Sequence, residues 1–260
     1  MFPDPSPQPP DPASDAPRPE IRQRLVALLE VLICSDFPTQ LAVGATFIAL
    51  GFKPYGSSGQ LQVAYVVGVS LVDAVVLVGL IVLFLYSHGE RPREVLFGRR
   101  RMADEIAYGV FPLTLIALGA AFGLLLAIQT FVPRLHSVQE NPLAGLLTSP
   151  RDAWLFGLVV LVAGGVREEI QRAFLLHRFE VWLGGGAFGV MVTSVAFGAG
   201  HLLQGYDVAI VTGLLGAFWG VVYLRRRSAV APMVSHAGFD LLQILQFITM
   251  RAPAFSVFRL

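Results

Sequence analysis

Long apolar stretches separated by short polar segments run from about residue 21 to residue 250. A helix needs about 20 mainly apolar residues to cross the hydrocarbon core of a bilayer. The stretches predict one span ending near residue 52 and further spans at about 60–87, 105–131, 152–181, 186–203, 207–224 and 229–250. The pattern therefore predicts an all-α fold, a polytopic transmembrane helical bundle of about seven spans.

Two features modify the N-terminal part of this pattern. Residues 1–20 are rich in Pro, Asp and Ser, have no basic start leading into an apolar run, and are predicted to form a disordered tail. The first apolar stretch is interrupted at Ser35 and Asp36, where either residue is suited to cap a helix with Pro38 in its first turn. We expect a kinked or interfacial helix there, within a region of N-terminal transmembrane helices at 21–131.

The composition supports a membrane location. Charged residues make up 14% of the chain and apolar residues 55%, whereas soluble domains average about 25% charged residues. The single cysteine, Cys34, excludes an internal disulfide and a cysteine-based zinc site. The formal net charge of +1 identifies no partner; we expect contact with the lipid bilayer and none with nucleic acid.

Arginine placement predicts the orientation of the chain. Most arginines between the predicted spans lie in segments that would share one side of the membrane: Arg22, Arg24, Arg91, Arg93, Arg99, Arg100, Arg101, Arg178, Arg225, Arg226 and Arg227. The other side holds scattered charges such as Lys53, Arg134 and Arg151. Positive residues mark cytoplasmic loops, so we expect an integral protein of the plasma (inner) membrane with a cytoplasmic N-terminus.

Ionisable residues inside the predicted spans are the candidates for chemistry, because they are costly in a bilayer. The fourth span contains the dense polar run Arg167-Glu168-Glu169-Ile170-Gln171-Arg172. Glu168 and Arg172 lie four residues apart, so they share a helix face and can pair. Glu169 points about 100° away. A structural ion-pair cluster is the alternative interpretation.

Two later spans carry histidines. His201 follows a run of small residues at the end of the fifth span, and His236 lies four residues before Asp240 in the seventh. Each could be structural, but imidazoles and carboxylates from three helices can together activate a water or bind a metal that does so. Asp73, in the second span, has no obvious partner; a hydrogen bond to a neighbouring helix, a substrate gate and a proton path all remain open.

Three ordered motifs give a resemblance to a known family. The motifs are Glu168-Glu169 followed by an arginine, Phe197-x-x-x-His201 and His236-x-x-x-Asp240. They resemble the CPBP family, which includes the type II CAAX prenyl endopeptidases (Ras-converting intramembrane proteases) and bacterial Abi-type proteins. The likeness covers residues 152–250, which we expect to be the CPBP-like catalytic transmembrane region.

The resemblance implies roles for these residues. Glu168, within the Glu168-Glu169 pair, would be the catalytic glutamate, and His201 would help it activate the attacking water. His236, together with Asp240, would stabilise the oxyanion of the tetrahedral intermediate. Arg172 and Phe197 would support the site.

The chain departs from the family's pattern at two positions. The family's arginine lies five residues after the first glutamate, where this chain has Ala173, and Arg172 lies one position earlier. The family most often has Asn where this chain has Asp240. Asp240 would either donate a hydrogen bond while protonated or orient His236.

The sequence thus predicts an intramembrane endopeptidase that hydrolyses a peptide bond of a membrane-associated protein near the cytoplasmic face, without a cofactor. A prenylated C-terminal tail is the eukaryotic precedent for the substrate. One alternative is a zinc-dependent protease with Glu168, His201 and His236 as ligands, although no H-E-x-x-H pair is present. The other is a proton-coupled transporter or a non-enzymatic membrane scaffold.

Overall fold

The computed structural model describes residues 20–57, 59–139 and 145–250, and every named element within them is helical. The helices are α1 (Ile21–Ile33), α2 (Phe37–Ala49), α3 (Val63–Ser87), α4 (Pro92–Leu96), α5 (Met102–Tyr108), η1 (Gly109–Leu113), α6 (Thr114–Phe131), η2 (Pro133–Leu135), α7 (Pro150–Val159), η4 (Val160–Arg167), α8 (Glu168–Trp182), α9 (Gly186–Ala199), η5 (Leu202–Gln204), α10 (Tyr206–Arg226) and α11 (Val230–Met250). The predicted all-α fold is confirmed for this part of the chain. The predicted tail lies outside it apart from residue 20.

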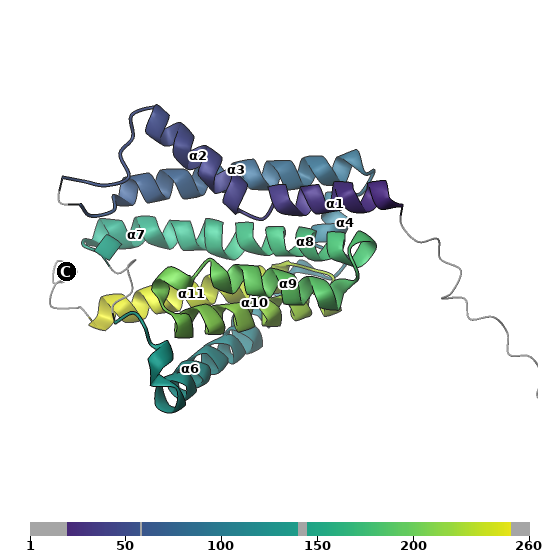
Figure 1. Ribbon diagram of the computed structural model, residues 1–260. Helices are drawn as coiled ribbons and strands as arrows, with labels where there is room; N and C mark the ends of the chain where they lie inside the picture. Colours follow the sequence, from purple (N-terminus) through teal and green to yellow (C-terminus); the bar gives the residue numbers. More distant parts are fainter. Residues whose placement is uncertain (1–19, 58, 140–144, 251–260) are drawn as a thin grey trace, which may run out of the picture.

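The helices form an elongated bundle with a central rod (Figure 1). α7, η4 and α8 follow one another without a break from Pro150 to Trp182 and make up this rod. Figure 1 shows α1, α2 and α3 along one side of the rod and α9, α10 and α11 along the other, with α6 outermost. The candidate residues of the rod therefore face helices on both sides.

Fewer spans than seven meet the requirements of length and composition in the described residues. Three helices do so: α3, the α5–α6 segment Met102–Phe131, and α10. The α1–α2 pair, bent by 44°, would be a fourth. α9 has only 14 residues, and α8 carries several charged residues. The count of seven is not confirmed, whereas the predicted kink before Pro38 is.

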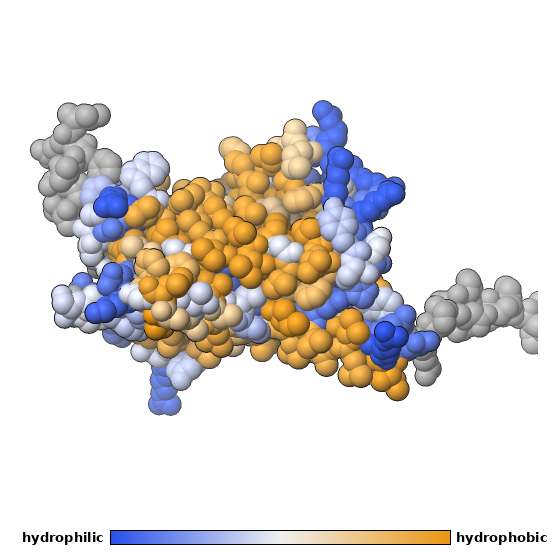
Figure 2. Space-filling model, turned by 90° about the horizontal axis from the view of Figure 1, so that it is seen from above, coloured by the Kyte–Doolittle hydropathy of each residue, from blue (hydrophilic) through white to orange (hydrophobic). Residues whose placement is uncertain are grey.

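The surface of the bundle fits a membrane environment. Figure 2 shows apolar side chains over the middle of one face and polar side chains toward both ends. Large apolar residues exposed on the helices include Val75, Phe111, Phe122, Phe131 and Trp154. An exposed apolar surface of this extent would be unfavourable in water. Together with the apolar spans, it identifies an integral membrane protein.

The loops rich in arginine meet at one end of the bundle. The backbone N–H of Ala229, after α10, donates to the carbonyl of Leu96 in α4 over 2.8 Å. In the same region the guanidinium of Arg226 binds the buried carboxylate of Glu105, with a shortest distance of 2.6 Å. We call this the arginine-rich end. Two of the segments predicted to share one side of the membrane, at 91–101 and at 225–227, thus lie together.

A buried ion network closes the arginine-rich end. Arg178, with 0% of its side chain exposed, donates to Glu30 of α1 and to Glu90, over 2.6 Å in each case. His88 lies 2.7 Å from Glu30, and His177 lies 2.5 Å from Glu90. Burial raises the pKa of Glu90, but hydrogen bonds and charges from His177 and Arg178 outweigh it and hold that pKa below its ordinary value. The network joins α1, α3 and α8.

The π-helical segment η4 brings α11 close to the rod. Its two glycines, Gly164 and Gly165, leave room that a side chain would fill. A Cβ on Gly165 would lie 2.6 Å from Cβ of Ala237 and 3.2 Å from the Met233 carbonyl oxygen. π-helical segments occur often at functional sites, and this one ends at Arg167, directly before Glu168.

Gly165→Ala is expected to destabilise the fold and lower activity. The added methyl group would push α11 away from η4, and overpacking of this kind costs roughly 1–3 kcal/mol. Gly157→Ala in α7 is the matched control, because a Cβ there would meet only a Leu241 methyl carbon at 3.9 Å. Thermal unfolding in detergent should show a lower midpoint for Gly165→Ala alone. Equal midpoints for the two variants would show that this contact is not tight.

Candidate active site

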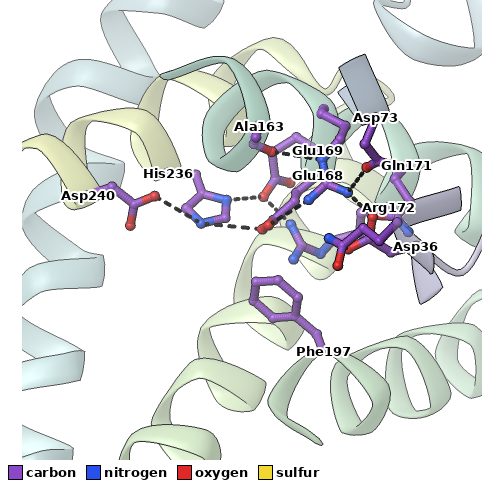
Figure 3. A network of polar contacts seen from close by, with 12 residues as sticks. Asp36, Asp73, Ala163, Glu168, Glu169, Gln171, Arg172, Phe197, His236 and Asp240 are labelled. Atoms are coloured by element: carbon purple, nitrogen blue, oxygen red, sulfur yellow. Dashed lines mark hydrogen bonds and ion pairs between the residues drawn. The ribbon is translucent and has the colours of Figure 1, made fainter. Parts of the chain in front are cut away.

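Glu169 is the buried member of the glutamate pair. Only 1% of its side chain is exposed. Its Oε1 accepts a hydrogen bond from Arg172, three residues later, and lies 2.8 Å from Nδ1 of His236 (Figure 3). The Arg172 guanidinium also lies over the Phe197 ring, 4.7 Å from its centroid. Glu169 therefore joins α8 to α11 through its contact with His236, and it holds that imidazole in place.

Glu168 has a different environment. Its side chain is 19% exposed, and Oε1 accepts from Nη2 of Arg167 over 3.2 Å. The pair of Glu168 and Arg172 that their spacing permits does not form, since Arg172 binds Glu169 instead. Spacings of three and four residues both permit a pair on a helix, and the rotation of α8 places Glu169, not Glu168, toward the interior. Glu168 is left facing the cavity described below.

His236 lies between three carboxylates. Besides Glu169 at Nδ1, its Nε2 lies 3.7 Å from Oδ2 of Asp240 and 3.9 Å from Oε2 of Glu168 (Figure 3). The imidazole stacks on Trp219 of α10, with ring centroids 4.1 Å apart and planes at 19°. An ionised carboxylate only accepts hydrogen bonds, so Glu169 assigns the Nδ1 proton and leaves Nε2 on the side of Glu168 and Asp240.

His201 lies just beyond the end of α9. Its Nδ1 donates to the Phe197 carbonyl over 2.8 Å, and its ring contacts the Phe197 ring edge-on at 4.9 Å between centroids. Within the described residues it makes no hydrogen bond or ion pair with a carboxylate. The Phe197 ring centroid also lies 6.1 Å from that of His236, so this one aromatic side chain lies beside both histidines.

Arg167 is a residue of the site that the motifs do not include. Its buried guanidinium donates to Asp36, at the start of α2, and to Asp73 of α3 over 3.2 Å, as well as to Glu168. Asp73 thus has the partner on a neighbouring helix that the sequence did not reveal, although its Oδ1 has no hydrogen bond. Asp36 precedes α2 as predicted but makes no capping hydrogen bond with its side chain.

One cavity joins these groups. It has a volume of about 530 Å³ and is lined by Glu168, His201, His236 and Asp240 among apolar side chains. Glu169 and Arg172 are absent from its lining. The three motifs therefore converge, with one glutamate facing the cavity and the other behind His236.

The alternative of a metal site depends on how the possible ligands are grouped. In the described part of the chain, no three His, Cys, Asp or Glu side chains are grouped so that they could hold a metal ion. Glu168, His201 and His236 are therefore not grouped in this way.

Comparison with known proteins gives a match to one family. Residues 150–242 match the family described as type II CAAX prenyl endopeptidase Rce1-like, a family of proteases. The match includes all three motifs and confirms the resemblance inferred from them. Searches of the curated proteins and of the solved structures found no match.

Proposed function

We propose that this protein is an intramembrane endopeptidase in which Glu168 activates a water molecule for direct attack on a peptide bond. The observation that carries the proposal is that the two adjacent glutamates have different surroundings. Glu169 is buried and held by Arg172 and His236, whereas Glu168 faces a cavity that His201, His236 and Asp240 also line. The match to a protease family over residues 150–242 supports the same reaction.

The proposed reaction is a two-step hydrolysis. Glu168 accepts a proton from the water as its oxygen attacks the carbonyl carbon. The tetrahedral intermediate then collapses, the C–N bond breaks, and the proton held by Glu168 passes to the leaving amine. His201, with Nδ1 bound to the Phe197 carbonyl, presents Nε2 as a second polar group for the water. We assign the developing oxyanion to His236, donating from Nε2 as an imidazolium, and to Asp240, donating while protonated.

Cleavage of peptides by the purified protein tests this proposal. The wild-type protein, reconstituted in lipid vesicles, would be incubated with a mixture of lipid-anchored, internally quenched peptides. Mass spectrometry of the products should show two fragments, one with a new carboxylate and one with a new amine. If no peptide is cleaved above the level of protein-free vesicles, the non-enzymatic alternatives, a scaffold or a proton-coupled transporter, are favoured.

Activity is expected to survive exhaustive metal chelation. The proposed site uses Glu168 directly and does not require zinc as a cofactor. Cleavage should continue after dialysis against a chelator, and elemental analysis should find no stoichiometric zinc. If chelation abolishes activity and zinc alone restores it, the protein is instead a zinc-dependent protease. Glu168, His201 and His236 would then be the first candidate ligands to substitute.

Asp240→Asn is expected to retain most activity and to remove a decrease in rate at high pH. Glu169 occupies Nδ1 of His236, so Asp240, on the Nε2 side, is not needed to set the tautomer. As an oxyanion donor, Asp240 works only while protonated, and the wild-type rate falls as the pH rises through its pKa. An amide donates at every pH. The pH–rate profiles of both proteins provide the check, and a large loss at all pH values would overturn the donor role.

The location and substrate class complete the proposal. Positive residues at the arginine-rich end favour an N-terminus in the cytoplasm and insertion in the plasma (inner) membrane. The substrate would be a membrane-associated protein, because the cavity lies within the bundle between apolar helices. A prenylated tail has the precedent of the matched family's description.

A further inference from the structure

The junction between α1 and α2 is bound to the central rod beside Glu168. Asp36, directly before α2, accepts a hydrogen bond from the buried guanidinium of Arg167. One turn further along the rod, Nε2 of Gln171 donates to the Cys34 carbonyl over 2.7 Å. The bend of 44° between α1 and α2 lies at this junction. The N-terminal helices are therefore tied to the residue that directly precedes the proposed base.

Arg167 is held in one orientation through all three nitrogens of its guanidinium. Nε donates to the Ala163 carbonyl over 3.3 Å, and Nη1 donates to Asp36 and, over 3.2 Å, to Oδ2 of Asp73. The remaining nitrogen, Nη2, donates to Oε1 of Glu168 over 3.2 Å. A guanidinium is a rigid plane, so the contacts of Nε and Nη1 fix the direction in which Nη2 points.

The arginine gives the two carboxylate oxygens of Glu168 different surroundings. Oε1 accepts from Arg167, whereas Oε2 accepts no hydrogen bond within the described residues and lies 3.9 Å from Nε2 of His236. In the view of Figure 3, Asp36 and Asp73 lie on the far side of Glu168 from His236. A general base needs an oxygen within hydrogen-bond reach of the water. Oε2 is the oxygen free to accept that proton, and the contact at Oε1 determines where it points.

Asp36 makes its contact from a strained backbone conformation. Its φ of 83° and ψ of −45° are close to those of the γ-turn that is rare and strained. Its side chain makes no capping hydrogen bond, and its second oxygen accepts from Nε2 of Gln40 over 2.8 Å. A buried ion pair is weak evidence for a gain in stability, and strain of this kind is concentrated at functional sites. This combination favours a role in the reaction over a role in the fold alone.

We propose that Arg167, held by Asp36 and Asp73, positions Glu168 for catalysis, so that α2 and α3 complete the active site. This inference rests on the proposed function, in which Glu168 is the general base. Both aspartates lie outside residues 150–242, the part of the chain that matches the protease family. The lining of the cavity also includes residues of both α2 and α3, so these helices form part of its wall.

Asp36→Gly separates positioning from a structural role. Glycine adopts a positive φ without strain, so the variant keeps the path of the chain and loses the carboxylate, while Arg167 retains Asp73 and Glu168. The midpoint of thermal unfolding in detergent should stay close to that of the wild-type protein. The turnover number for lipid-anchored, internally quenched peptides should fall about 10–100-fold, with the Michaelis constant within about threefold, because misplacing a catalytic group by 1 Å can cost about 10²-fold.

The matched control is Ser35→Gly. It gives the same backbone freedom to the neighbouring residue of the junction and leaves the Asp36 carboxylate in place, so the turnover number should not change. Arg167→Lys is a second test: lysine keeps the charge but cannot bind three carboxylates in one plane, and the turnover number should again fall more than the Michaelis constant rises. Wild-type turnover in both Asp36→Gly and Arg167→Lys would overturn the proposal, as would an equal loss in Ser35→Gly.

These measurements distinguish this inference from the proposed function. If the wild-type protein and Asp36→Gly cleave the peptides equally well, the positioning role fails and the proposed function stands. If the wild-type protein cleaves none of them, the proposed function fails, and unfolding midpoints still test the cluster. The shifts caused by Asp36→Asn and Arg167→Gln should then not add in the double variant, since residues of one ion network are coupled. Additive shifts would refute the arrangement.

Discussion

Glu168→Gln is expected to lower the rate of peptide hydrolysis by about 10²–10⁴-fold, the usual effect of losing a general base. The amide keeps the size of the side chain and can still interact with Arg167, but it cannot take up the proton of the attacking water. Because Glu168 is partly exposed to the cavity and Glu169 holds the buried contacts, the variant should fold normally. The measurement is cleavage by purified protein alongside thermal unfolding in detergent.

The control for Glu168→Gln is Glu94→Gln. Glu94 lies in α4, is 45% exposed, and pairs only with exposed arginines in the described residues. This substitution also removes one negative charge, but it should change neither activity nor the unfolding midpoint. Near-wild-type cleavage by Glu168→Gln would show that Glu168 is not the general base.

Glu169→Gln is expected to reduce both activity and stability. Glu169 binds His236 at Nδ1 and balances the charge of the imidazolium that donates from Nε2. A neutral amide disfavours that charged ring, and loss of one oxyanion donor costs about 10²–10³-fold in rate. The variant also leaves the buried Arg172 without its carboxylate, and breaking a buried ion pair costs about 3–5 kcal/mol. The turnover number should fall more than the Michaelis constant rises.

The contrast between the two glutamate variants is the informative result. Cleavage kinetics and thermal unfolding, measured on both proteins, should show lost activity in each but a lowered midpoint only for Glu169→Gln. If Glu169→Gln retains wild-type activity and midpoint, Glu169 is not the anchor of His236. If its activity returns fully at a temperature where it is folded, its role is structural alone.

The sequence predicted the residues that meet but not how they pair. Periodicity and the cost of charge in a bilayer identified Glu168 and Glu169 on one helix and His236 and Asp240 on another. The structure brings the three carboxylates within 4 Å of His236. The partner of Arg172 is Glu169 rather than Glu168, and helical spacing alone does not say which of two adjacent glutamates faces the interior. That depends on how α8 is rotated against α11.

Other features of the site depend on tertiary contacts that no local pattern reveals. Asp36 had the spacing of a helix cap, yet its carboxylate binds Arg167, which is 131 positions away in the chain. Trp219, stacked on His236, had no motif to mark it, although it lies among the glycines of α10. For Arg167, the one local signal of a role in the site was its position directly before the glutamate pair.

A high-resolution experimental structure of the wild-type protein in lipid tests the central claim most directly. The decisive observation is the density in the cavity beside Glu168 and Nε2 of His236. The account predicts a water there at hydrogen-bond distance from the Glu168 carboxylate, about 2.5–3.0 Å. An ion held by Glu168, His201 and His236 at about 2.0–2.2 Å, the spacing of zinc ligands, would contradict it.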